Sequence, residues 1–224
     1  MRELILGLDE AGRGPVMGPM VLAGCLIEKK TERVLRKLGV KDSKMITPKR
    51  RDFLEKELKK VINAHELVVC HADEIDSTNS NGVNLTELEA RKFAQIINNL
   101  NTGEERMKII IDCPSIGIQS WTHALKTKID NLSNLEIVIE HKADKNYLAV
   151  AAASILAKCE RERHMSQLKE KYGDLIGSGY CTDPLTISFV EKFAAKFEKE
   201  GLFRKSWSTW KVAYTKLKQV ELNF

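Results

Sequence analysis

The stretch that decides the fold is LILGLDEAGRGP, residues 4–15. Its apolar first half is typical of a buried strand, and the run ends in two acids, Asp9 and Glu10. Glycines follow at positions 12 and 14 and indicate a turn. The stretch therefore predicts a strand over residues 3–9 that delivers carboxylates to one end of a sheet.

Two later apolar runs also end in acids. Residues 107–111 run directly into Asp112, and residues 135–139 are followed by the sequence EHKAD, which ends at Asp144. Helical patterns separate the runs, and strands that alternate with helices are typical of an α/β sheet that is at least partly parallel.

Periodicity, capping residues and turn residues predict the remaining elements. The helix expected over residues 147–172 has an apolar first half that should be buried and a charged second half that should lie in solvent. Glycines near residue 178 suggest a boundary between an α/β core domain, residues 1–180, and a basic helical region, residues 181–224. Further strands are expected over 20–27 and 67–70, and further helices over 34–38, 48–62, 84–100 and 184–199.

The positive charge is concentrated near the C-terminus. The formal net charge is +5, yet residues 192–218 alone hold eight Lys and Arg against two Glu. A basic segment of this kind favours a polyanionic partner over a small neutral substrate.

The composition argues against several classes of protein. Hydrophobic residues make up 43% of the chain, which is enough for a core and argues against disorder. No apolar run approaches the roughly 18 residues of a membrane span, so we expect no membrane association. The five cysteines are odd in number and far apart, so we expect a cytoplasmic protein without a disulfide framework.

The acids at the strand ends are candidate metal ligands. Ligand sites in open α/β sheets lie beyond the carboxyl ends of strands, so Asp9, Glu10, Asp112 and Asp144 meet if their strands are parallel neighbours. Clustered carboxylates repel one another unless they hold a hard divalent cation, and oxygen ligands select Mg²⁺ or Mn²⁺. The alternative is separate cap, turn or loop acids, and the spacing alone does not decide.

Adjacent residues in a regular strand point to opposite faces, so Asp9 and Glu10 serve one site only if the chain bends there. The glycines and proline at positions 12–15 make a bend plausible.

Two glycine-containing segments are candidate ligand loops. Gly12-Arg13-Gly14 leaves room for backbone amides to approach a ligand, and residues 177–180 present Tyr180 for stacking on a sugar or base. Residues 41–44 offer lysines to phosphates. A plain glycine turn, a packed tyrosine and a solvated turn remain the respective alternatives.

The motifs of this chain resemble those of the ribonuclease HII family, or type 2 ribonuclease H, and its archaeal members above all. They occur in the family's order and cover roughly residues 3–210. The motifs are GLDEAGRGP (7–15) with GP (18–19), LGVKDSK (38–44), ID (111–112), EHKAD (140–144), AAASILAK (151–158), and GSGY (177–180) with DP (183–184).

The resemblance implies a ribonuclease H-like fold, in which helices flank a five-stranded mixed sheet, with a helical C-terminal extension. It implies an endonuclease that hydrolyses the RNA strand of RNA/DNA hybrids and cuts on the 5′ side of ribonucleotides embedded in duplex DNA. The products would carry a 3′-hydroxyl and a 5′-phosphate. Two Mg²⁺ or Mn²⁺ ions are expected with substrate.

The resemblance also implies roles for individual residues. Four acids would hold the metals, a glycine segment and a tyrosine would recognise the sugar, and three polar residues would contact phosphates, although a helix interior also explains the serine and the second lysine. In that order they are Asp9, Glu10, Asp112 and Asp144; Gly12, Arg13, Gly14 and Tyr180; and Lys44, Ser154 and Lys158.

Some positions depart from the family pattern. Leu148 and Cys181 stand where proline is common, and Ser208 replaces a usual basic residue, although Arg204 and Trp207 fit the pattern. The terminal residues resemble a shortened sliding-clamp-binding peptide and suggest a clamp as a partner; they are Gln219, Leu222 and Phe224.

Other functions remain open on sequence grounds. They are a different metal-dependent nuclease on the same fold and a non-catalytic module that binds nucleic acid. A small-molecule phosphatase is disfavoured by the basic C-terminal segment. We expect a monomer.

Overall fold

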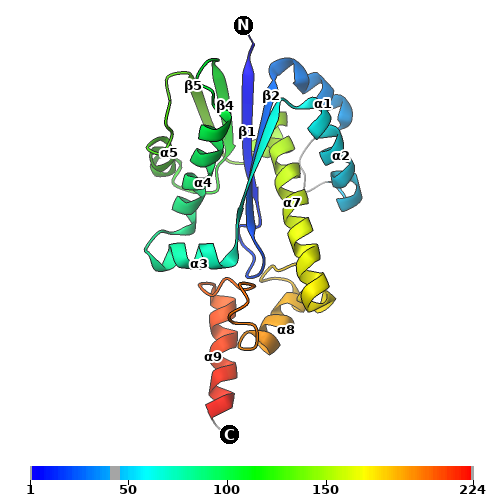
Figure 1. Ribbon diagram of the computed structural model, residues 1–224, viewed down its shortest axis with the longest axis vertical. Coiled ribbons are helices and arrows are strands. Elements are labelled where there is room, and N and C mark those ends of the chain that lie inside the picture. The colour runs from blue at the N-terminus through cyan, green and yellow to red at the C-terminus, as the bar shows by residue number, and fades with distance from the viewer. Residues whose placement is uncertain (1, 41–45, 223–224) are drawn as a thin grey trace. The chain divides into compact units, whose positions relative to one another are not determined.

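A five-stranded sheet organises the first part of the chain. The computed structural model describes residues 2–40 and 46–222 (Figure 1). The strand order is β3-β2-β1-β4-β5, with β1 and β2 antiparallel, and with β4 parallel to both β1 and β5. The sheet is therefore mixed, as the resemblance implied. The strands are β1 (Leu4–Ala11), β2 (Met20–Glu28), β3 (Ala64–Cys70), β4 (Met107–Asp112) and β5 (Leu135–Glu140).

Helices connect most of the strands. Proline at the first helical position follows an N-cap at Thr47 and again at Asp183, and in both cases the cap side chain accepts a backbone hydrogen bond. The helices are α1 (Glu32–Leu38), α2 (Pro48–Val61), α3 (Ala72–Ser80), α4 (Leu85–Leu100), α5 (Ile118–Lys126), α6 (Ala143–Asn146), α7 (Leu148–Tyr172), α8 (Pro184–Phe193) and α9 (Ser208–Leu222), with short 3₁₀ turns η1 (Lys29–Thr31) and η3 (Asp174–Ile176).

Most predicted elements begin and end within three residues of the observed ones. The helix expected over residues 184–199 is shorter, because α8 ends at Phe193. Beyond that point backbone hydrogen bonds of three- and four-residue spacing alternate, so the chain tightens into turns.

The chain forms two compact units. The first comprises Met1–Ala11, Val21–Val68 and Leu85–Cys159, and the second comprises Gly12–Met20, Val69–Asn84 and Glu160–Phe224. The domain division at residue 180 stays a prediction.

In the core of the first unit, helix α7 packs very closely against the central strand β1. The apolar first half of α7 is buried as predicted, and its backbone at Ala149 lies directly against Gly7 of β1. A Cβ atom at Gly7 would lie 2.2 Å from the carbonyl carbon of Ala149, so only glycine fits there.

The second unit has its own apolar core. It combines Ile176 of η3 with residues of α8, of α9 and of the segment between those two helices. Phe189 packs at ring-centroid distances of 4.9 Å from Phe193 and 6.3 Å from Phe203. Val16 and Met17, which follow the glycine segment, belong to the same core. That burial anchors the far end of the glycine segment within this unit.

The second half of α7 lies largely in solvent, as predicted, except at two residues. Arg161 is only 7% exposed and Met165 only 6%. Both side chains contact glycines of the second unit: Arg161 lies against Gly12, and Met165 against Gly18. A helix surface that reads as charged in sequence is therefore partly an internal surface.

The bend expected at or just after Asp9 does not begin before the end of β1. The pairing of β1 with β2 continues in register through Asp9–Ala23, Glu10–Leu22 and Ala11–Val21. Asp9 and Glu10 thus lie in a regular stretch of strand.

Within residues 2–40 and 46–222, no helix combines the length and the apolar character that a bilayer crossing requires.

The contact between Gly7 and α7 gives a first prediction. Gly7→Ala would force the backbones of β1 and α7 apart, so we expect a loss of about 2 kcal/mol or more in the free energy of unfolding. Urea denaturation measures it. Gly117→Ala is the matched control in the same unit, because φ is −87° and the nearest atom is the Ser120 hydroxyl oxygen at 3.0 Å. Equal stability of the two variants would contradict the explanation.

Candidate active site

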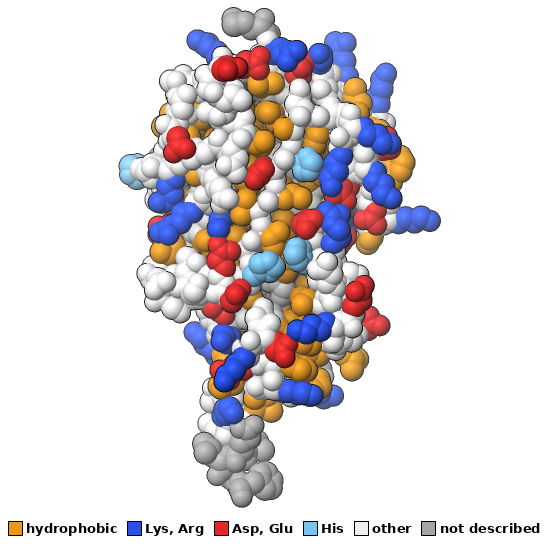
Figure 2. Space-filling view, in the orientation of Figure 1, with side chains coloured by type: hydrophobic (Ala, Val, Ile, Leu, Met, Phe, Trp, Pro, Cys, Tyr) orange, Lys and Arg blue, Asp and Glu red, His pale blue; other side chains and the backbone are white. Residues whose placement is uncertain are grey.

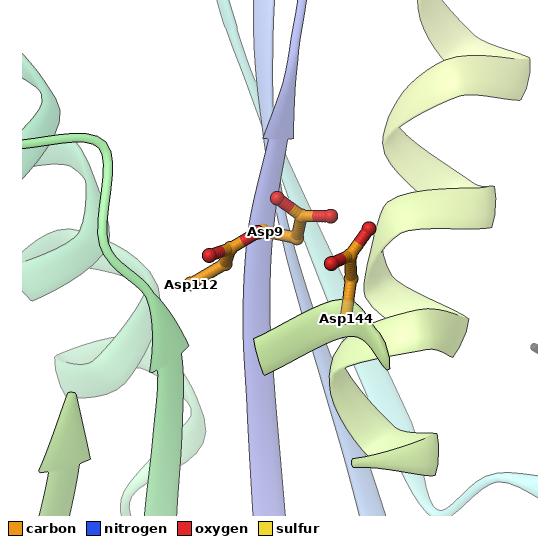
Figure 3. Close-up of side chains that lie close together, drawn as sticks. All are labelled: Asp9, Asp112 and Asp144. Carbon is orange, nitrogen blue, oxygen red and sulfur yellow. The ribbon is translucent and has the colours of Figure 1, made fainter. Parts of the chain in front are cut away.

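Three carboxylates from separate elements meet in the first unit. Asp9 lies on β1, Asp112 ends β4, and Asp144 lies on α6 directly after β5. One oxygen from each lies within 4.8 Å of the others, and Figure 3 shows the side chains turned toward one another. The parallel pairing of β1, β4 and β5 brings the carboxyl ends of these strands to the same edge, as the sequence predicted.

The turn after β5 fixes two of these acids together. The backbone amides of Lys142 and Ala143 donate to Asp112 Oδ1 at 2.7 and 3.3 Å. Lys142 adopts the left-handed conformation with φ of 60°, which is uncommon outside glycine. Asp112 thus holds the start of α6, the helix that carries Asp144, and a strained residue is retained where it serves the site.

Asp9 sits in poorly hydrated surroundings. It is 5% exposed, its Oδ1 accepts from the amide of Glu10 at 2.8 Å, and the Ser154 hydroxyl also hydrogen-bonds to it. Burial raises the pKa of the Asp9 carboxyl to about 7; the bond from Ser154 opposes this rise, and the charge of Asp112 adds to it. An anionic Asp9 is therefore costly unless a cation lies nearby.

The donor set fits a hard divalent cation. All of the clustered atoms are carboxylate oxygens, which Mg²⁺ and Mn²⁺ prefer. Asp144 is 4% exposed, and its Oδ1 is buried without a hydrogen-bond donor among the described residues. A buried oxygen that points toward two other carboxylates needs a positive charge beside it to offset the cost of burial.

Two residues of α7 accompany Asp9. Ser154 is 1% exposed and hydrogen-bonds to the Asp9 carboxylate, while the positive charge of Lys158 lowers the pKa of that carboxylate. The structure thus brings both residues to the acids. Their contacts with phosphate stay predictions.

Glu10 is not among the three clustered carboxylates. Burial raises the pKa of the thiol of Cys113, the residue after Asp112, and the Glu10 carboxylate lies close enough for its charge to add to this rise. Its role as a metal ligand stays a prediction.

The glycine segment belongs to the second unit, where two side chains hold it by its carbonyl groups. Arg204 donates to the carbonyl oxygens of Gly12 at 2.6 Å, Arg13 at 2.8 Å and Gly18 at 3.0 Å. Trp207 Nε1 donates to the carbonyl oxygen of Gly14 at 3.0 Å. Every turn carbonyl from residue 12 to 14 is therefore bound.

Tyr180 also lies in the second unit, and it is 41% exposed. The guanidinium of Arg161 lies 5.0 Å from the ring centroid and donates to the carbonyl oxygen of Ser178 at 3.1 Å. The carbonyl oxygen of Gly179 accepts from Val16 at 2.9 Å, so this loop is tied to the glycine segment. An exposed aromatic face is available for stacking.

Several site residues have a different status. Lys44 lies outside the described residues, so nothing tests its position. The sequence did not indicate a role for Arg161, because a basic residue in a charged helix is usually solvated; only its burial reveals a role.

Two residues stand where proline is common in the family. The sulfur of Cys181 lies 3.8 Å from the carbonyl oxygen of Gly14, and α7 begins at Leu148.

Comparison with known proteins gives consistent matches. The model of the family described as Ribonuclease HII matches residues 6–210. Ribonuclease HII of Methanobrevibacter smithii is 42% identical over 207 residues, covering 92% of this chain and 95% of the relative.

Solved structures agree with this. Ribonuclease H2 from Pyrococcus horikoshii OT3 superposes with a TM-score of 0.85 at 34% identity, covering 96% of this chain and 99% of that one. RNase HII of Archaeoglobus fulgidus, solved in a complex with PCNA, superposes with a TM-score of 0.79 at 36% identity. The superposition covers 92% of this chain and 95% of that one. The predicted ribonuclease H-like architecture is confirmed.

The raised pKa of Asp9 predicts an unusual stability effect. The folded pKa, about 7, lies above 3.8, the ordinary value for an aspartate, so the anionic carboxylate destabilises the metal-free fold increasingly as pH rises from about 4 to 7. Asp9→Asn removes this charge. In chelator at pH 8 we expect a melting temperature about 5 °C or more above that of the unmodified protein, with a smaller gain at pH 5.

Asp183→Asn is the control, and it should change the melting temperature in the opposite direction. Hydrogen bonds from Ser178 lower the pKa of Asp183, and this side chain caps α8, so the same chemical change should lower the melting temperature at pH 8. An Asp9→Asn protein no more stable than its parent at pH 8 would contradict the account of the acid cluster.

Proposed function

Because the chain belongs to the ribonuclease HII family, as its motifs predicted, we propose that it hydrolyses the RNA strand of RNA/DNA hybrids and cuts 5′ of ribonucleotides embedded in DNA. The observation that carries the proposal is the buried group of Asp9, Asp112 and Asp144, whose oxygens lie within 4.8 Å of one another. Family membership makes the protein an enzyme of the ribonuclease H class; the metal mechanism and the substrate preference are the proposal.

The three clustered acids would hold divalent metal, with Glu10 proposed as a fourth ligand. When bound, a pair of such ions activates water for attack on phosphorus and stabilises the departing 3′-oxygen. The chain prepares the ligands beforehand. Two amides orient Asp112, the Ser154 hydroxyl orients Asp9, and the start of α6 presents Asp144. Preorientation of this kind lowers the reorganisation that catalysis requires.

Sugar recognition is proposed for the glycine segment and Tyr180. The ribose 2′-hydroxyl is the group that distinguishes RNA from DNA at a given position, and backbone amides can read it at close range. Gly14 supports this use, because a Cβ atom built there would meet nothing within 4 Å. The exposed ring of Tyr180 would stack on the next deoxyribose. Lys158 and Lys44 would contact phosphates.

Basic surface is not confined to the C-terminal segment. Figure 2 shows Lys and Arg side chains along the edge where α1 and α2 lie. The basic side chains of η1 and α1 there are Lys29, Lys30, Arg33, Arg36 and Lys37. Such surface supports a polyanionic substrate.

A sliding clamp remains a proposed partner. The complex of the Archaeoglobus fulgidus relative with PCNA supports it. In this chain α9 extends to Leu222 and Gln219 is exposed, whereas Phe224 lies outside the described residues.

A cleavage assay tests the proposed function. We expect the protein with Mg²⁺ or Mn²⁺ to cut a duplex that carries one ribonucleotide, on its 5′ side, and to leave an all-DNA duplex intact. Asp112→Asn should lower the rate by about a thousandfold or more, because it weakens metal binding and disturbs the turn that holds Asp144. Product mapping on labelled strands gives the cut position.

The outcomes separate the alternatives. Binding without cleavage in every metal would favour a non-catalytic nucleic-acid-binding module. Equal cutting of the two duplexes would indicate another nuclease on the same fold. Glu136→Gln, an exposed acid on β5 that is paired with Lys108, is the matched control and should cleave normally.

Salt dependence tests where the phosphates bind. Replacing the exposed lysines 211, 216 and 218 of α9 by glutamine should lower the slope of log binding constant against log salt by about 0.9 for each phosphate that these lysines neutralise. Replacing three basic residues of α1, Arg33, Arg36 and Lys37, is the comparison with equal charge change. If only the α1 replacements alter the slope, the C-terminal segment does not contact phosphates of the nucleic acid.

A further inference from the structure

The guanidinium of a buried arginine near the C-terminus donates its hydrogen bonds to one turn. Arg204 is 0% exposed, and its three guanidinium nitrogens donate to carbonyl oxygens of Gly12, Arg13 and Gly18. The Arg204 amide in turn donates to the carbonyl oxygen of Val16 at 2.8 Å. The planar fork of donors thus spans the turn from its start to its end.

The hydrogen bonds of Arg204 determine where the amides of the turn point. The described chain has no cis peptide bond, and in a trans peptide the carbonyl and the N–H of one unit point in opposite directions. The carbonyls of Gly12 and Arg13 face Arg204, so the N–H groups of Arg13 and Gly14 point away from it. Trp207 holds the next carbonyl, that of Gly14, in the same manner.

The buried position of Arg204 is costly for a cation. This cost argues that the side chain does more than fill space in the core. Among the described residues no carboxylate lies within ion-pair distance of Arg204. Burial lowers the pKa of Arg204 to about 10, and the nearby charge of Arg161 contributes to this shift. Carbonyl dipoles of the glycine turn, together with the charge of Asp76, compensate for this cost. The turn and the cation therefore stabilise one another.

The side of the turn at Gly14 is open. A Cβ atom there would have nothing within 4 Å, whereas one at Gly12 would clash with Arg161 and the carbonyl oxygen of Pro19. The protein thus fills the space beside Gly12, whereas the space beside Gly14 is open.

We propose that Arg204, assisted by Trp207, is a positioning residue for ribose recognition: it presets the peptide planes of residues 12–14 so that their amides meet the 2′-hydroxyl. This inference rests on the proposed function, since it assigns a cause to the selectivity proposed for the glycine segment. Arg204 touches no substrate in this account and acts through the turn.

Binding measurements on intact protein test the inference. The probes are a fluorescent duplex with one ribonucleotide and its all-DNA counterpart, both in EDTA, so that cleavage does not interfere. The readout is the ratio of the two dissociation constants. We expect Arg204→Lys, which keeps the charge but cannot span three carbonyls, to reduce this ratio by about tenfold.

Two further variants sharpen the test. Trp207→Phe removes one hydrogen bond to Gly14 yet keeps an aromatic ring, which lies 5.1 Å from the Arg204 guanidinium in the parent protein, so we expect a smaller reduction. Ser206→Ala is the matched control, because it removes a bond to Asp76 from the same segment without touching the glycine turn. It should lower the melting temperature slightly and leave the ratio unchanged.

Each outcome decides between two accounts. A parent protein with a ratio of one refutes the proposed ribose recognition itself. A parent that discriminates, together with Arg204→Lys and Trp207→Phe proteins that keep its ratio, overturns the inference and leaves the proposed function standing. If Arg204→Lys does not fold, Trp207→Phe against Ser206→Ala decides alone.

Discussion

The need to keep three carboxylates close together in poorly hydrated surroundings governs the first unit. Burial raises the pKa of Asp9 to about 7, and repulsion from the charge of Asp112 adds to this rise. The surrounding structure supplies partial compensation through two amides on Asp112 and a hydroxyl on Asp9. The sheet holds the acids in place because β1, β4 and β5 are parallel neighbours. The cluster therefore costs stability in the absence of a cation, and its oxygens could hold a divalent metal ion.

The second unit shows the opposite electrostatic arrangement. Two buried guanidinium groups, Arg161 and Arg204, contact backbone carbonyls instead of carboxylates. Carbonyl oxygens carry only partial charges, so they orient the cations without neutralising them. The same contacts fix the glycine turn and the loop that carries Tyr180. The clustered acids and the candidates for ribose recognition thus belong to different units of the chain, each with its own internal support.

Sequence reasoning succeeded where a local pattern carries the information and failed where it does not. Strand β4 and the turn into Asp112 follow from an isoleucine triplet next to an acid, and α2 follows from an N-cap before proline. Helix α3 was missed because its Asp, Ser, Thr and Asn residues are weak helix formers. Helix α5 was missed although Trp121 and Leu125, four residues apart, are both buried. That spacing was a usable signal.

The sequence by itself determined which residue types are available to the site, the order of the motifs and most strand and helix positions, because these depend on side-chain chemistry and short-range periodicity. Tertiary structure decided which acids meet. Strand pairing gathers Asp9, Asp112 and Asp144, which lie far apart along the chain. It also decided that Arg161 and Arg204 are internal. Burial and hydrogen-bond partners arise from residues far apart along the chain, so no local pattern contains them.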